Sequence, residues 1–148
     1  MTFKPAAENT GYRFVRVDLP GSPAIPAIVD NVVELARGTT IALGDAKVHT
    51  VEHVLAALVG TGVDNCTIEV SNNEPPAGDV SSMPYVEMIH RAGIVEQSAL
   101  RREIILEESI RYVDESRGTE IVALPNDTYR VTVMVDYKNP ALGSQHTG

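Results

Sequence analysis

Two histidines and a glutamate lie close together in residues 49–53, which read His-Thr-Val-Glu-His. Imidazole nitrogens are common zinc ligands, and a carboxylate beside a bound metal ion is a suitable general base for hydrolysis. If these residues are helical, His49 and His53 stand four positions apart and project to the same side. The spacing predicts a metal-assisted hydrolytic site in which the two histidines bind the metal ion and Glu52 accepts a proton.

The same five residues also have a plainer interpretation. Two histidines on an exposed helix face are most often simply hydrated. The pattern His-x-x-Glu-His is, however, the arrangement of one class of metallopeptidases, in which both histidines bind zinc and the glutamate is the base. The pattern alone does not separate these alternatives, so the surrounding residues must decide.

A helix that begins near residue 50 is expected to position these groups. Its apolar stripe follows the spacing i, i+3, i+4, i+7 and i+8, and consists of Val51, Val54, Leu55, Leu58 and Val59. Thr50 is the expected N-cap, and Gly60 and Gly62 are expected to end the helix. On the histidine side, Ala56, Ala57 and Gly60 have almost no side chain, so a second surface could approach closely.

The composition describes a globular chain and excludes several function classes. Of the 148 residues, 43% are hydrophobic and 22% are charged, which allows a core to form. The net charge of −8 argues against nucleic acid as a partner, because phosphate binding needs clustered Lys and Arg. No apolar run is long enough to span a membrane, and no signal-peptide pattern is visible, so a cytoplasmic location is expected. Cys66 is expected to pack within a strand.

Alternating apolar residues predict strands on both sides of this helix. They cover residues 12–17, 27–30 and 65–70, with a hairpin of 39–43 and 47–48. Residues 20–26 contain three prolines and a glycine and are expected to be a rigid connector. A second helix is expected to start at Ser81 and Ser82 and to end at Gly93. His90, near its end, is expected to be a surface residue.

The last third of the chain contains three strand-like runs and no helix. They are residues 103–112, 118–124 and 129–137. The apolar face of such a sheet needs a second layer, so this part is expected to be an incomplete domain. The chain begins within a strand-like segment and ends without a cap, so it is expected to be a piece of a longer protein. An uncovered, valine-rich sheet is expected to cause self-association.

Several short motifs follow one another in a set order. They are Arg37-Gly38-Thr39-Thr40, Thr50-Val51-Glu52-His53-Val54-Leu55-Ala56-Ala57-Leu58, Gly62-Val63-Asp64-Asn65, Glu74-x-Pro76, Asp79-x-Ser81-Ser82-x-Pro84-Tyr85-Val86, Ala92-Gly93-Ile94-Val95-Glu96-Gln97 and Asp136-Tyr137-Lys138-Asn139-Pro140. Together they resemble UDP-3-O-acyl-N-acetylglucosamine deacetylase, the zinc enzyme of lipid A synthesis in Gram-negative bacteria. The pattern is nearest to the form fused to a beta-hydroxyacyl carrier-protein dehydratase.

This resemblance implies an α+β fold of two similar domains, each a sheet backed by two helices, which face each other across the active site. Residues 1–100 would be the first deacetylase domain without its N-terminal strand or strands, and residues 101–148 the truncated start of the second. The resemblance also implies that His53 is a ligand of Zn2+ and that Glu52 is the catalytic general base, whereas His49 binds no metal. The other zinc ligands would lie in a later part of the second domain, outside this chain.

Two residues depart from the family pattern in the loop before the second helix. The family has glycine at the position of Val80 and a longer aliphatic residue at that of Ala77. Valine resists a positive φ angle. A left-handed turn at this position therefore predicts either a strained loop or a reshaped one.

Three hypotheses about function follow. The first is a zinc-dependent deacetylase that acts on UDP-3-O-acyl-N-acetylglucosamine, with this chain supplying Glu52 and His53 but inactive by itself. The second is a metallopeptidase with His49 and His53 as ligands. The third is a non-catalytic fragment with a hydrated His-Glu-His face. Reading the coding sequence on both sides of this segment would separate the first hypothesis from the third.

Overall fold

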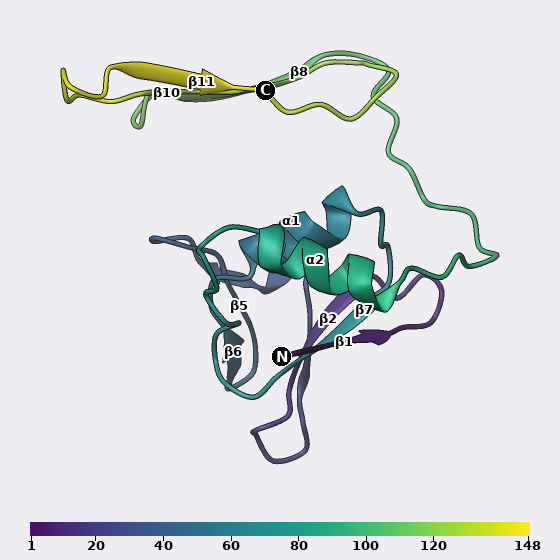
Figure 1. The fold of residues 1–148 in the computed structure, drawn as a ribbon. Helices are drawn as coiled ribbons and strands as arrows, with labels where there is room; N and C mark the ends of the chain where they lie inside the picture. Colours follow the sequence, from purple (N-terminus) through teal and green to yellow (C-terminus); the bar gives the residue numbers. More distant parts are fainter. The chain divides into compact units, whose positions relative to one another are not determined.

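The structure is a computed structural model that describes all residues, Met1–Gly148. It is a mixed α+β structure with two α-helices (Figure 1), which confirms the predicted class. The chain divides into two units, Met1–Arg101 and Arg102–Gly148. The assignment of these parts to a first and a second deacetylase domain stays a prediction. Neither helix is long and apolar enough to cross a membrane.

The first unit contains both α-helices and two sheets. Its elements are β1 (Thr2–Pro5), β2 (Tyr12–Arg16), β3 (Ala24–Pro26), the 3-10 helix η1 (Val29–Asn31), β4 (Val32–Glu34), β5 (Thr40–Leu43), β6 (Ala46–Val48), α1 (Glu52–Gly60), β7 (Cys66–Val70) and α2 (Met83–Ala92). The larger sheet has the order β1-β7-β2-β3, in which β2 and β7 are parallel and the other pairs antiparallel. The smaller sheet is antiparallel, in the order β4-β5-β6.

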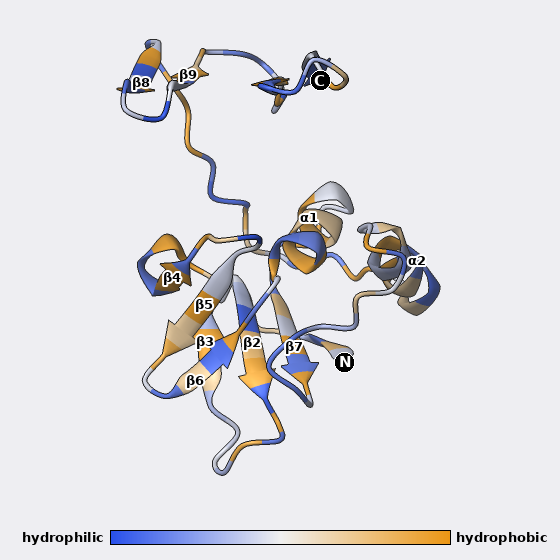
Figure 2. Ribbon diagram, turned by 90° about the vertical axis from the view of Figure 1, so that its left-hand side faces the viewer, coloured by the Kyte–Doolittle hydropathy of each residue, from blue (hydrophilic) through white to orange (hydrophobic).

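Both helices pack on one face of the larger sheet, as Figures 1 and 2 show. The reason is visible in β7, where Cys-Thr-Ile-Glu-Val alternates and every second side chain is buried. The buried cluster combines Phe14, Ile25, Ile68 and Val70 of the sheet with Val54, Ala57 and Leu58 of α1 and Tyr85 and Ile89 of α2. The core therefore fixes α1 directly on the sheet.

The strands predicted from clean alternation are confirmed, whereas the proline-rich region was predicted wrongly. β2, β7 and the β5–β6 hairpin lie where they were expected. The third strand forms at Ala24–Pro26, within the expected connector, while the expected strand at 27–30 is replaced by η1. Pro26 has no N–H to donate, which an edge strand tolerates, and Ile25 is buried. Burial of Ile25 explains why this short segment pairs with β2.

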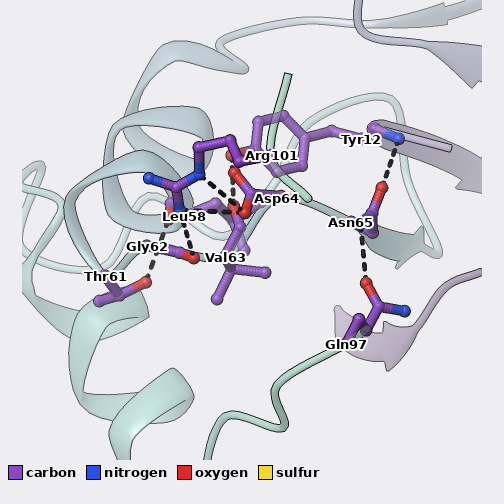
Figure 3. Close-up of polar contacts among 10 residues, drawn as sticks. Tyr12, Leu58, Thr61, Gly62, Val63, Asp64, Asn65, Gln97 and Arg101 are labelled. Atoms are coloured by element: carbon purple, nitrogen blue, oxygen red, sulfur yellow. Dashed lines mark hydrogen bonds and ion pairs between the residues drawn. The ribbon is translucent and has the colours of Figure 1, made fainter. Parts of the chain in front are cut away.

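Residues that follow α2 are bound to the first unit as a strap (Figure 3). The Arg101 guanidinium donates from Nε and Nη2 to Asp64 Oδ2, both at 3.0 Å. Gln97 bonds Asn65 at 2.8 Å. The Glu8 carboxylate accepts bonds from the Ala99 N–H and from Ser98, and these bonds lower the pKa of Glu8. The first unit therefore extends to Arg101, beyond its last helix.

The second unit consists of two separate antiparallel ladders. One pairs β8 (Ile110–Asp114) with β9 (Thr119–Ala123), and the other pairs β10 (Val133–Asp136) with β11 (Ser144–Thr147). The predicted run 103–112 was too long at its start, because residues 103–109 form no strand, and β11 was not predicted. The six candidates for an uncovered apolar face are all exposed, namely Ile105, Val113, Val122, Val131, Val133 and Val135.

The loop before α2 keeps a left-handed residue although valine occupies the position. Val80 has a φ of +61° and its side chain is 74% exposed. Its N–H donates to the Ala77 carbonyl at 2.9 Å, which closes a tight turn. Of the two outcomes expected for this loop, strain and reshaping, the structure therefore shows a strained turn.

Replacing Val80 with glycine is expected to raise the free energy of unfolding by about 1 kcal/mol. Relief of a left-handed conformation contributes about 1–2 kcal/mol, and the greater freedom of glycine in the unfolded chain removes about 0.5–1 kcal/mol. Urea unfolding followed by circular dichroism measures the change. Val29→Gly is the matched control, because Val29 is 83% exposed without a positive φ, and it should destabilise. If both variants lost stability equally, the turn at Val80 would carry no strain.

Candidate active site

The start of α1 differs from the prediction because Thr50 does not cap the helix. Thr50 has a φ of +54°, and the N-cap residue is Val51, with no side-chain cap. The Thr50 hydroxyl instead donates to Glu74 Oε1 at 2.6 Å. The Val51 N–H donates to the Thr39 carbonyl at 3.2 Å. The start of α1 is thus bound to the segment before β5 and to the loop before α2, in place of a side-chain cap.

His49 lies outside α1, which contradicts the predicted pairing of two histidines on one helix face. The left-handed Thr50 separates His49 from the helix, so the helical rotation per residue does not extend to it. The His49 ring Nδ1 lies 2.9 Å from the Thr40 hydroxyl, and its backbone N–H donates to Asn73. The metallopeptidase hypothesis therefore loses the geometry on which it depended.

The buried face of α1 is also rotated from the predicted stripe. Val51, Val54 and Leu58 are buried as expected, but Val59 is 56% exposed and Ala57 is buried. Val54, Ala57 and Leu58 follow the spacing i, i+3 and i+4 and are the buried residues within α1, and the partly buried Leu55 packs against the same cluster. The predicted end is confirmed, because Gly62 has a φ of +75° and a Schellman arrangement of bonds closes the helix.

Glu52 and His53 are consecutive residues in the first turn of α1, and both are half-buried. Glu52 Oε2 accepts a hydrogen bond of 2.9 Å from the Thr39 N–H. Gly38 lies beside the other oxygen, since a Cβ atom on Gly38 would stand 3.2 Å from Glu52 Oε1. The carboxylate is therefore bonded through one oxygen, and the segment 38–39 contacts both.

The loop before α2 forms a second side of this region. Glu74 accepts the Thr50 hydroxyl bond, and the Tyr85 hydroxyl donates to the Pro76 carbonyl. Burial raises the pKa of Tyr85, and the negative charge of Glu74 raises it further, so Tyr85 stays a hydroxyl donor at neutral pH. The motifs that contain Gly38, Thr39 and Glu74 were identified in the sequence, but these residues had no predicted role. Only the fold shows that they surround Glu52 and Thr50.

The possible metal ligands in this chain can supply part of a zinc site but not a complete one. A catalytic zinc ion takes three protein ligands as a rule. No group of three or more His, Cys, Asp or Glu side chains lies close enough together to bind a metal ion. His53 has an imidazole suited to zinc, and Glu52 stands next to it, but further ligands are required.

The chain has a mixed α+β fold, and a glutamate and a histidine are adjacent at the start of its first helix. The family model described as "UDP-3-O-acyl N-acetylglycosamine deacetylase" matches residues 1–148. The chain belongs to this family of lipid A biosynthesis, which confirms the resemblance. The family implies zinc, and no group of three or more possible metal ligands lies together in this chain.

Two kinds of relatives are similar to this chain. It is 56% identical over 148 residues to a bifunctional LpxC/FabZ enzyme of Chlorobaculum tepidum and 43% identical over 145 residues to one of Bacteroides thetaiotaomicron. It is 41% identical over 146 residues to the UDP-3-O-acyl-N-acetylglucosamine deacetylase of Thermosynechococcus vestitus. These matches cover 100%, 98% and 98% of this chain, but 32%, 32% and 50% of the relatives. The chain thus spans about a third of the bifunctional relatives and half of the single enzyme.

Proposed function

We propose that this chain forms part of a zinc-dependent amide hydrolase that removes acetate from UDP-3-O-acyl-N-acetylglucosamine, with His53 as a zinc ligand and Glu52 as the general base. The observation that carries the proposal is the match of the family model over residues 1–148, in a chain that places Glu52 and His53 together on the first turn of α1. A cytoplasmic location belongs to the same proposal. The absence of a helix that could cross a membrane is compatible with it.

The residues of this chain have distinct tasks in this chemistry. A bound zinc ion would polarise the amide carbonyl and make water more acidic. His53 would offer an imidazole nitrogen as a ligand. Glu52 takes one proton from the attacking water as the water oxygen bonds to the amide carbonyl carbon. The carbon–nitrogen bond then breaks, the leaving nitrogen takes up that proton, and acetate and a free amine result. Proton transfer of this kind contributes about 10²- to 10⁴-fold in rate.

Metal removal tests the proposal. The full native product of the gene should release acetate from UDP-3-O-acyl-N-acetylglucosamine, lose this activity on dialysis against a chelator, and recover it when zinc is restored. Cleavage of a peptide without cleavage of the nucleotide sugar would favour the metallopeptidase hypothesis instead. A gene product that cleaves neither the peptide nor the nucleotide sugar would favour the hypothesis of a non-catalytic protein.

The 148-residue chain by itself is expected to bind zinc weakly. One proposed ligand is available where about three are needed for a fixed site, so calorimetry at neutral pH should show no tight stoichiometric binding. His49→Ala and His53→Ala should each leave this result unchanged. A nanomolar site abolished by His49→Ala would contradict the proposal, because it would make His49 a ligand.

We further propose that residues 1–100 correspond to the first deacetylase domain, a sheet backed by two helices, and residues 101–148 to the start of a second, similar domain. The division of the structure between Arg101 and Arg102 supports a boundary at this point.

Exposed apolar side chains on both ladders of the second unit support self-association of the chain.

Self-association should be measurable by sedimentation velocity at micromolar concentration, where the 148-residue chain is expected to sediment faster than a monomer. Replacing Val133 and Val135 together with glutamate puts two charges on β10 and should restore the monomer. Val29→Glu changes a more exposed valine of the first unit and should leave the self-association unchanged. A monomeric wild type, with slow hydrogen exchange throughout residues 103–137, would mean that these strands are covered within the chain.

A further inference from the structure

The carboxylate of Glu52 is bound to the backbone of the segment that precedes β5. The Thr39 N–H donates to Glu52 Oε2 at 2.9 Å, and the Thr39 carbonyl accepts from the Val51 N–H at 3.2 Å. These two bonds run in opposite directions between the same pair of segments. Neither depends on the Thr39 side chain. They hold the first turn of α1 and the side chain of Glu52 against residue 39.

Gly38 completes this contact because it has no side chain. A Cβ atom at this position would lie 3.2 Å from Glu52 Oε1, 3.5 Å from Thr50 Oγ1 and 3.8 Å from Thr50 Cα. Gly38 does not have a left-handed φ, so its backbone conformation is open to other residues. The close approach of Glu52 and Thr50 is what favours glycine here. A methyl group would have to displace the carboxylate or Thr50.

Thr50 is held in place and cannot easily move away from a methyl group on residue 38. Its hydroxyl donates to Glu74 at 2.6 Å, and its φ of +54° is unfavourable for a β-branched residue. Arg37, on the other side of Gly38, also has a left-handed φ, of +62°. Strained residues of this kind persist where the surrounding structure holds them, often at functional sites. Glu52 Oε1 lies at the end of a longer side chain, so the Glu52 carboxylate is the neighbour that a methyl group would shift.

We propose that Gly38 and the backbone N–H of Thr39 form a cradle that positions the Glu52 carboxylate for proton transfer. In this cradle Oε2 is held by the Thr39 N–H, and Oε1 lies beside Gly38. Gly38 and Thr39 are positioning residues, since they act through Glu52. The catalytic role of the cradle rests on the proposed function. The hydrogen bond and the close contact that form the cradle can be tested without measuring any reaction.

The first experiment follows the Thr39 amide by NMR in the zinc-free 148-residue chain. Gly38→Ala and Glu52→Ala should each shift the Thr39 amide proton and speed its hydrogen exchange by about tenfold, as loss of one hydrogen bond does. Glu52→Gln retains an acceptor oxygen and should leave the Thr39 exchange rate nearly unchanged. Gly60→Ala is the matched control, because a Cβ atom there meets nothing within 4 Å.

Glu52→Ala keeps this test decisive if Gly38→Ala fails to fold, since it removes the acceptor without adding bulk. A Thr39 amide that is unaffected by Glu52→Ala would overturn the cradle. So would a folded Gly38→Ala variant in which the Thr39 amide is unchanged.

The second experiment measures steady-state kinetics of the full native gene product with zinc bound. Gly38→Ala is expected to lower kcat by about 10- to 100-fold, as a displacement of about 1 Å can, with KM and zinc content unchanged. The exposed Val29→Ala should retain wild-type kcat. A wild type without deacetylase activity would overturn the proposed function and leave the NMR result standing. An active Gly38→Ala enzyme with wild-type kcat and an altered Thr39 amide would overturn the positioning role alone.

Discussion

Replacing Glu52 with glutamine is expected to slow deacetylation by the full native gene product by about 10²- to 10⁴-fold, with its zinc content unchanged. This loss corresponds to about 3–5 kcal/mol of activation free energy. Glutamine has the size of glutamate and keeps an oxygen that can accept the 2.9 Å bond from the Thr39 N–H, but it cannot take up a proton from water. Initial rates of acetate release and metal analysis of the same samples measure both quantities.

His49→Ala is the control for this prediction. His49 lies before the helix and contacts the Thr40 hydroxyl, so its removal should leave turnover nearly unchanged. Equal losses in the two variants would remove the support for Glu52 as the base. A loss of zinc in Glu52→Gln would point to Glu52 as a ligand instead.

The sequence was sufficient for those parts of the fold in which local patterns and burial agree. β7 is an example, because each apolar residue of its alternating run is buried in the core. Gly62 and Gly93 were recognised as helix ends, and both have positive φ angles. In contrast, β3 depends on the burial of Ile25 against β2, which no local pattern near three prolines indicates. Pairing with β2 decided this strand.

The candidate site shows more clearly that contacts between separate segments could not be predicted from local sequence patterns. The adjacency of Glu52 and His53 was visible in the chain, and the motif order assigned them a family. The start of α1 was predicted wrongly, since a threonine before a helix is ordinarily a good cap, whereas the Thr50 hydroxyl bonds Glu74, 24 residues away. The contact of Thr39 with Glu52 is made by a backbone N–H, which every residue except proline has. Residue type therefore carried no signal for it.

The packing of α1 on the sheet determines where both proposed catalytic groups lie, so a cavity beneath this helix is expected to destabilise the first unit strongly. Leu58 is 1% exposed and belongs to the same buried cluster as Phe14 and Ile68. Leu58→Ala should lower the free energy of unfolding by about 2–5 kcal/mol, because apolar contact is lost and a cavity remains. Since small domains have about 5–15 kcal/mol in total, much of the stability would be removed.

Leu35→Ala provides the matched control, because Leu35 is 73% exposed and its truncation should change the unfolding free energy by no more than about 0.5 kcal/mol. Urea unfolding of both variants, followed by far-ultraviolet circular dichroism, gives the two values under one condition. A large loss only in Leu58→Ala would show that α1 is bound to the sheet through its core face, as the positions of Glu52 and His53 require. If Leu58→Ala and Leu35→Ala changed the unfolding free energy equally, α1 would not be packed on the sheet in solution. The contact between Glu52 and Thr39 would then have no structural support.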